Sequence, residues 1–265
     1  MTHIISLACL KGGVGKTTAT ASLGGLLASS GQRTLLIDLD SQHNLTKTFV
    51  DIDSEDFDGR TIFDAFSEYV SADVDEADDV RLPILHVREN LDIVPSDRRC
   101  SYIDMQFITA VARESILKNL LDEIKGEYDW ILIDTPPSLG IRLLNALTAS
   151  KNILIPITCD SYAVDGLKDL KGEIAELRKI NRKLSILGVF ISRFNGQRSM
   201  DRALAGILEN EPDWKKHFLA TKIPENTTIS HAPVAKTDIN SYAPSSSSAR
   251  GYRELLAEIL ERVNA

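Results

Sequence analysis

The sequence predicts an α/β fold: a doubly wound, mostly parallel sheet with helices on both faces. Short, nearly continuous apolar runs recur along the 265 residues, as in strands that are covered on both faces. Helical patterns alternate with these runs, and this alternation requires right-handed crossovers between parallel strands. A glycine-rich turn lies between the first run and the first helical pattern, and open sheets of this kind bind ligands at the carboxyl ends of their strands.

Six apolar runs are predicted to be strands. They are residues 3–9, 34–38, 91–94, 130–134, 152–156 and 186–191. Six segments in which apolar residues recur at helical spacing are predicted to be helices. They are residues 16–30, 101–125, 139–150, 161–182, 199–210 and 246–263. The four serines at 245–248 are expected to cap the last helix, because serine hydroxyls accept hydrogen bonds from free N–H groups.

Composition and length place the chain in the globular class. With 43% apolar and 26% charged residues, we expect one domain over residues 1–265. The acidic segment 51–79 is predicted to be a partly helical, solvated excursion. The net charge of −8 argues against a strongly basic nucleic-acid wrapper but is compatible with a local basic patch.

Cysteine usage and hydropathy predict a cytoplasmic protein. Cys9, Cys100 and Cys159 are far apart and form no C-x-x-C pair, so we expect buried, reduced thiols. The first apolar run lacks the basic start and long apolar region of a signal peptide. No apolar run approaches the length of a membrane span.

One glycine-rich segment predicts a phosphate-binding loop. Its residues are Lys11, Gly12, Gly13, Val14, Gly15, Lys16, Thr17 and Thr18. It follows a predicted strand and begins a predicted helix, where glycines let backbone N–H groups turn toward phosphate oxygens and the helix N-terminus favours negative charge. Lys16 would reach the β- and γ-phosphates, and the Thr17 hydroxyl would ligate Mg²⁺. Leu10 occupies the position of the first glycine in the standard pattern, and Lys11 is an additional lysine.

Three aspartates stand where two other predicted strands end. Asp134 ends the run 130–134 and could hold a Mg²⁺-bound water. Asp38 ends the run 34–38 and Asp40 follows two residues later, and this spacing on an extended chain points both carboxylates to one side. One of the two could orient a metal-bound water while the other positions the attacking water.

These motifs resemble those of the ParA/MinD family of ATPases with a deviant Walker A motif. The resemblance rests on Lys11–Thr18, on Leu36–Thr46 and on Ile131–Pro137, and the ParA (Soj-like) branch fits best. The stretches 91–96, 222–226 and 241–252 continue it over nearly the whole chain.

The resemblance implies a switch in which two chains enclose two ATP molecules with Mg²⁺. Lys11 would reach the partner's phosphates, and Asp40 would position the hydrolytic water. Asp38 and Asp134 would support the metal that Thr17 ligates, and Ile223 and Pro224 would lie near adenine. A cation delivered in trans stabilises charge that develops during phosphoryl transfer, so dimerisation and hydrolysis are coupled. In the family a partner peptide stimulates slow hydrolysis, which implies a ParB-like activator.

The resemblance also implies non-specific DNA binding by the ATP dimer, through counterion release and avidity. Two departures weaken this expectation. Family members often carry basic residues where this chain has Pro244–Ser248, and often Arg where it has Glu225. Basic residues remain, both in the C-terminal part and on the helix at 161–182, where acidic residues are interspersed. They are Arg198, Arg202, Lys215, Lys216, Lys222, Lys236, Arg250, Lys168, Lys171, Arg178, Lys179, Arg182 and Lys183.

Three alternatives stay open at this point. Some relatives position a protein cargo instead of a plasmid or chromosome. The MinD branch binds membranes through a basic amphipathic tail; here the apolar stripe of the last helix is expected to face the core, and only Asn264 and Ala265 follow it, so we expect no membrane contact. A small-molecule phosphotransferase or ligase would use the same loop but would need a further substrate pocket.

Overall fold

One eight-stranded sheet forms the centre of the molecule. The computed structural model of the chain describes residues 2–52, 54, 57–73, 76–124, 126–160 and 163–264. The strands are β1 (His3–Leu7), β2 (Thr34–Asp38), β3 (Leu85–Arg88), β4 (Leu91–Val94), β5 (Trp130–Asp134), β6 (Asn152–Thr158), β7 (Ser185–Phe194) and β8 (Phe218–Pro224). Their order across the sheet is β3-β4-β2-β5-β1-β6-β7-β8. Only the β3–β4 pair is antiparallel among these neighbours, so the prediction of a mostly parallel sheet is confirmed.

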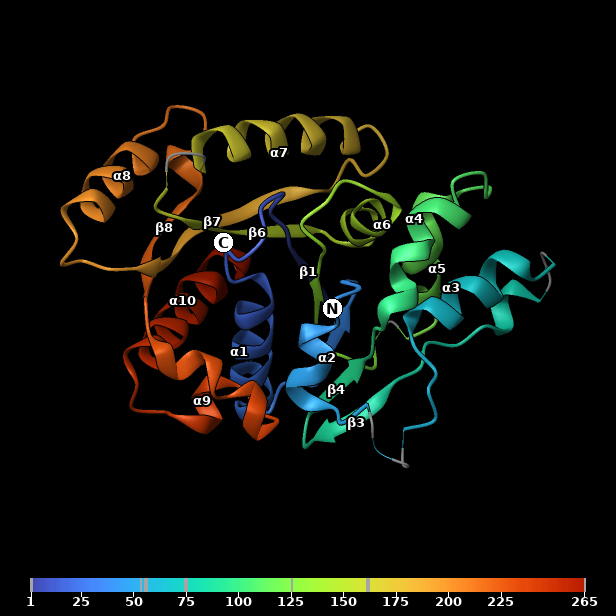
Figure 1. The fold of residues 1–265 in the computed structure, drawn as a ribbon. Helices are drawn as coiled ribbons and strands as arrows, with labels where there is room; N and C mark the ends of the chain where they lie inside the picture. Colours follow the sequence, from blue (N-terminus) through green and yellow to red (C-terminus); the bar gives the residue numbers. More distant parts are fainter. Residues whose placement is uncertain are drawn as a thin grey trace.

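Helices cover both faces of the sheet (Figure 1). Their bounds are α1 (Lys16–Ser29), α2 (Asn44–Phe49), α3 (Ile62–Ser71), α4 (Ile103–Gln106), α5 (Ile116–Asp122), α6 (Ile141–Ala149), α7 (Ala163–Leu177), α8 (Ser199–Glu209), α9 (Ile239–Tyr242) and α10 (Ser247–Asn264). Alternation along β1 divides the core: Ile5 packs on the side of α1, α2 and α10, and Ile4 on the side of α3 to α6. The two layers confirm the doubly wound architecture.

The two strands that the sequence did not predict lie at the edges of the sheet. β3 has no fully buried residue, and β8 alternates between buried and exposed positions. An edge strand is buried on fewer sides, so it lacks the continuous apolar run that identifies a central strand. β3 joins β4 through a tight turn in which Asn90 adopts a left-handed conformation (φ 59°), which asparagine tolerates.

The predicted helices are present, with one large difference. In place of a continuous helix over 101–125, the described part of this segment contains 3-10 turns, the four-residue α4 and the seven-residue α5. Ala112 adopts a left-handed conformation in the middle (φ 50°), which interrupts helical hydrogen bonding. α7 ends at Leu177, five residues early, and residues 161 and 162 of its predicted range lie outside the described residues.

The last helix confirms two predictions. Ser246 Oγ accepts a hydrogen bond from the Ala249 N–H at 3.2 Å, so one of the four serines caps α10. Tyr252, Leu255 and Ile259 of its apolar stripe are buried in the core. Within the part of the chain that the structure describes, no helix combines the length and apolar character needed to cross a bilayer.

Candidate nucleotide-binding site

The glycine loop connects the carboxyl end of β1 to the first turn of α1. Gly13 (φ 75°) and Gly15 (φ 86°) both adopt the left-handed conformation that glycine allows without a steric penalty. Gly15 directly precedes Lys16, the first residue of α1. Ser192 Oγ, from β7, donates a hydrogen bond to the Val14 carbonyl oxygen at 2.7 Å, which attaches the loop to β7. The loop therefore has the backbone shape that a phosphate cradle requires.

Lys16 is buried within the loop. Its Nζ donates to the carbonyl oxygens of Cys9 and Lys11 at 3.1 and 3.2 Å. Burial lowers the pKa of Lys16, and the nearby charge of Asp134 opposes this effect. A desolvated ammonium group that is held by carbonyl dipoles attracts an anion more strongly than a solvated one does. The sequence placed Lys16 on the phosphates, and its position in the loop supports that role.

Thr17 and Asp134 form a pair beside the loop. Thr17 Oγ1 donates to Asp134 Oδ2 at 2.6 Å, while Asp134 Oδ1 is buried without a hydrogen-bond partner. Burial, and next the charge of Asp38, raise the pKa of Asp134 well above its ordinary value. A hydroxyl and an unpartnered carboxylate oxygen are donors that suit a hard cation such as Mg²⁺, so the residues fit the metal. The described residues offer no cluster of three or more His, Cys, Asp or Glu ligands, so nucleotide phosphates and water would complete the coordination.

Asp38 lies beside Asp134 in the sheet register and is fully buried. Its Oδ2 accepts hydrogen bonds from Thr46 N and Thr46 Oγ1 at 2.9 and 2.8 Å, and its Oδ1 accepts one from Asp40 N at 3.0 Å. Burial raises the pKa of Asp38 to about 6, although the Thr46 donors oppose the shift. The carboxylate thus fixes the loop between β2 and α2. Both oxygens of Asp38 accept hydrogen bonds from protein donors. Its support of the metal stays a prediction.

Asp40 lines the cavity above this loop. Its Oδ1 accepts from Gln42 N at 3.0 Å, and its carbonyl oxygen accepts from Ser96 Oγ at 2.9 Å. Asn44, the first residue of α2, lines the same cavity. Asn44 falls within the stretch Leu36–Thr46, which indicated no individual role for it. These side chains can contact water or phosphate at the γ-phosphate end of the site.

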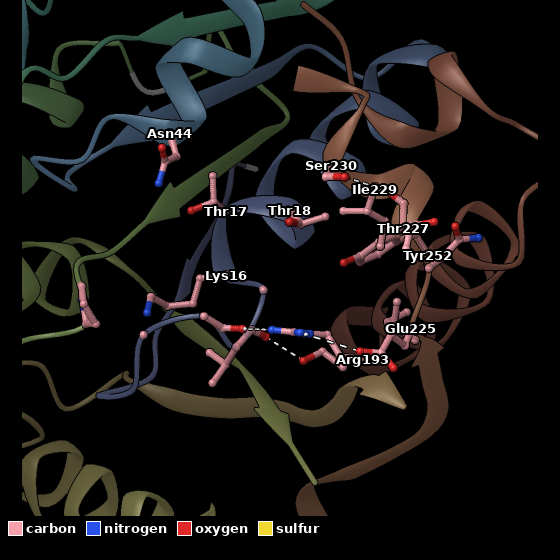
Figure 2. A pocket seen from close by; sticks show the side chains of 18 of the residues that line it. Lys16, Thr17, Thr18, Asn44, Arg193, Glu225, Thr227, Ile229, Ser230 and Tyr252 are labelled. Carbon is pink, nitrogen blue, oxygen red and sulfur yellow. Dashed lines mark hydrogen bonds and ion pairs between the residues drawn. The ribbon is translucent and has the colours of Figure 1, made fainter. Parts of the chain in front are cut away.

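The loop opens into a cavity of about 770 Å³. Besides Gly12 to Thr18, the residues that line it are Asp40, Asn44, Pro137, Ser192, Arg193, Ile223, Glu225, Asn226, Thr227, Ile229, Ser230 and Tyr252. Figure 2 shows Lys16 and Thr17 at one end, and Thr227, Ile229 and Tyr252 at the other. A polar end and a partly apolar end suit a nucleotide, with its phosphates on the loop and its base opposite.

The two residues predicted near adenine differ in position. Ile223 lines the cavity, whereas Pro224 packs against Gly251 of α10. Sequence reasoning missed Arg193 and Tyr252, which line the cavity from β7 and α10. Arg193 lies in no recognisable motif, and Tyr252 ends the stretch 241–252, which indicated no role for it; the fold brings the end of β7 and the start of α10 to the glycine loop.

Lys11 does not line this cavity, although its four C-terminal neighbours do. Its Nζ lies 2.5 Å from Asp160 Oδ2, just beyond the end of β6. The structure therefore separates the two lysines of the loop: Lys16 lies inside the phosphate cradle, and Lys11 lies outside it.

Several of the basic residues that were considered for DNA binding are in ion pairs. These pairs are Lys171 with Asp213, Lys179 with Glu176, Lys222 with Glu209 and Arg198 with Glu225. Glu225 also lies 3.7 Å from Arg193 (Figure 2). The glutamate thus offsets two arginines at the rim of the cavity.

The parallel sheet, the glycine loop and the Thr17–Asp134 pair define a P-loop nucleotide-binding protein of the deviant type with a second loop lysine. Comparison with known proteins agrees. The family model described as an AAA domain (AAA_31) matches residues 2–186. The chain is 34% identical to the sporulation initiation inhibitor protein Soj of Bacillus subtilis over 260 residues, covering 98% of both chains. It is 33% identical to the chromosome-partitioning ATPase Soj of Treponema pallidum, covering 95% of this chain and 94% of the relative.

Solved structures show the same fold with nucleotides bound. A putative plasmid partition protein of Borrelia burgdorferi, bound to AMPPNP, matches with a TM-score of 0.80 and 29% identity over 99% of this chain and 100% of that one. Cobyrinic acid a,c-diamide synthase of Mycobacterium smegmatis, with bound ADP and magnesium, matches with a TM-score of 0.81 and 26% identity over 100% and 96%. The chain belongs to the ParA/MinD family of deviant Walker A ATPases, in its Soj-like branch.

Proposed function

We propose that this chain is an ATP-driven dimerising switch that hydrolyses ATP to ADP and phosphate with Mg²⁺ and partitions DNA, a plasmid or a chromosome. The observation that carries the proposal is the separation of the two loop lysines. Lys16 occupies the cavity of its own chain, whereas Lys11 lies outside it and can serve the cavity of a second chain. A site that takes one cation from its partner is complete only in the dimer.

Each chain's own residues would have distinct tasks. The N–H groups of the loop and Lys16 would bind the phosphates, and Thr17 and Asp134 would hold Mg²⁺, which supplies charge neutralisation at the transferring phosphoryl group. Asp40 would orient the attacking water. Asp38, through its bond to Asp40 N and its two bonds from Thr46, would keep Asp40 at the cavity.

The remaining parts of the switch extend this proposal. Hydrolysis is slow in the isolated protein and is stimulated by a ParB-like activator. The ATP dimer, a cytoplasmic species that associates with the nucleoid, binds DNA without sequence preference through phosphate contacts. The similarity to the chromosome-partitioning ATPase Soj of Treponema pallidum and to the putative plasmid partition protein of Borrelia burgdorferi supports a role in DNA partitioning. Positioning of a protein cargo uses the same switch and differs only in the adaptor.

One observation favours a second candidate. The second candidate is a small-molecule phosphotransferase or ligase. The structural match to a diamide synthase shows that the same fold occurs in an enzyme of small-molecule synthesis. Such an enzyme consumes ATP only with an acceptor, whereas the switch releases phosphate without one. Measuring phosphate release from purified protein with Mg·ATP alone separates the two.

The dimer is tested with Lys11→Ala. We expect this variant to bind ATP with an unchanged dissociation constant, because its Lys16 cradle is intact, and to remain monomeric with ATP in light scattering. A variant that forms the wild-type ATP dimer would remove the trans role of Lys11.

A further inference from the structure

The ion pair between Lys11 and Asp160 links the entrance of the glycine loop to the end of a neighbouring strand. Lys11 follows β1 and Asp160 follows β6, and these strands are adjacent in the sheet. The 2.5 Å approach of Lys11 Nζ to Asp160 Oδ2 holds the lysine against its own chain. A lysine that must reach a partner's nucleotide has to leave this position first.

Asp160 is held in place for this contact. Its Oδ2 accepts a hydrogen bond from Thr158 Oγ1 at 2.5 Å, and its N–H donates to the Thr158 carbonyl oxygen at 3.0 Å. The side chains of Lys11 and Asp160 are 39% and 30% exposed, so the pair is partly screened from water. A carboxylate that is oriented by its neighbours binds a cation better than a freely rotating one, because less side-chain entropy is lost.

We propose that Asp160 is a positioning residue that retains Lys11 in the monomer and thereby raises the protein concentration needed for ATP-dependent dimerisation. The inference rests on the proposed trans role of Lys11 and adds the residue that opposes it. Each dimer breaks two such pairs. If each pair shifts the equilibrium about fivefold, as a partly exposed pair worth about 1 kcal/mol does, two pairs shift the dimer dissociation constant about 25-fold.

The test compares Asp160→Asn, which removes the charge at nearly constant shape, with Asp160→Glu, which keeps a carboxylate. The dimer dissociation constant is measured by sedimentation in Mg·ATP and in Mg·ADP. We expect Asp160→Asn to dimerise in ATP at about 25-fold lower concentration and Asp160→Glu to stay within a few-fold of wild type. The matched control is Asp213→Asn, which frees Lys171 far from the loop and should change nothing.

A second readout does not depend on dimerisation. In the nucleotide-free monomer, the rate at which an amine-acylating reagent modifies Lys11 is measured by mass spectrometry. Asp160→Asn should raise this rate several-fold at Lys11 and leave Lys171 unchanged. Two results would overturn the inference. One is an acylation rate at Lys11 that is equal in the wild type and in Asp160→Asn, and the other is a dimer dissociation constant of Asp160→Asn that is equal to or higher than that of the wild type. Failure of the wild type to dimerise at all would instead refute the proposed function, and the retaining role of Asp160 with it.

Discussion

Replacing Thr46 with valine tests the buried hydrogen-bond network that holds the loop between β2 and α2, which carries Asp40. The hydroxyl of Thr46 donates to Asp38 Oδ2 at 2.8 Å and accepts from Ser96 N at 2.9 Å. Valine keeps the shape but leaves the carboxylate short of one donor and the Ser96 N–H without a partner. A hydrogen bond to a charged group contributes roughly 1.5–3 kcal/mol, and an unpaired buried N–H costs roughly 1–3 kcal/mol. We expect the free energy of unfolding to fall by about 3–5 kcal/mol at pH 8.

The loss should depend on pH in a defined direction. The pKa of Asp38 is about 6 in the fold, above its ordinary 3.8, so ionisation of Asp38 lowers stability as the pH rises from about 4 through 6. Removing a Thr46 donor raises this pKa further, which enlarges the loss above pH 6. At pH 5 the carboxyl is largely protonated in both proteins, and mainly the cost at Ser96 remains.

The assay is urea unfolding at pH 5 and pH 8, with Thr48→Val as the control. Thr48 lies on the same helix, but its hydroxyl donates to the Asn44 carbonyl oxygen within that helix, so its loss should cost under about 1 kcal/mol. Thr46→Val should also lower the hydrolysis rate more than ATP affinity, because Asp40 loses its support. Equal costs for the two variants, or a Thr46→Val cost that is the same at both pH values, would refute the reasoning.

Two further predictions concern charge at the site and at its rim. The raised pKa of Asp134 means that the nucleotide-free protein loses stability as the pH rises above about 4. Asp134→Asn should therefore be more stable than wild type at pH 8, but Mg·ATP should not raise its stability in thermal unfolding. A stabilisation by Mg·ATP equal to that of the wild type would contradict the metal role of Asp134. Glu225→Gln should free Arg193 and Arg198 and tighten DNA binding of the ATP dimer on the order of several-fold at low salt, with a steeper salt dependence. The control is Glu176→Gln, which removes the same charge on α7; an equal effect there would show that the change does not come from Arg193 and Arg198.

The central sheet and the phosphate loop could be predicted because their signals are local. Six central strands carry apolar runs, and Lys16 and Thr17 stand in a motif whose spacing follows from the loop itself. Asp38 and Asp134 could be placed together at the carboxyl ends of the central strands because both end such runs. The edge strands β3 and β8 carried no comparable signal, since exposure on one side dilutes the apolar pattern.

What the sequence could not provide was pairing between distant segments. The contacts of Lys11 with Asp160 and of Arg198 with Glu225 join residues that are far apart in the chain, and a charged residue shows no preference for one distant partner over another. The same limit applies to Asp38. Its position at a strand end predicted a metal role, while its bonds to Thr46 and Asp40 depend on how the β2–α2 loop folds back.

Complementation between two inactive variants tests the central claim, that each catalytic site is completed by the partner's lysine. Lys11→Ala chains keep Asp40, and Asp40→Ala chains keep Lys11, so a mixed dimer contains one complete site. Each variant alone should show background phosphate release with Mg·ATP. Mixing them in equal amounts should restore phosphate release to at most about one quarter of the wild-type rate, because Lys11→Ala chains dimerise only with Asp40→Ala chains and each mixed dimer has one complete site of two. A mixture that stays at background while both variants fold and bind ATP would contradict the account.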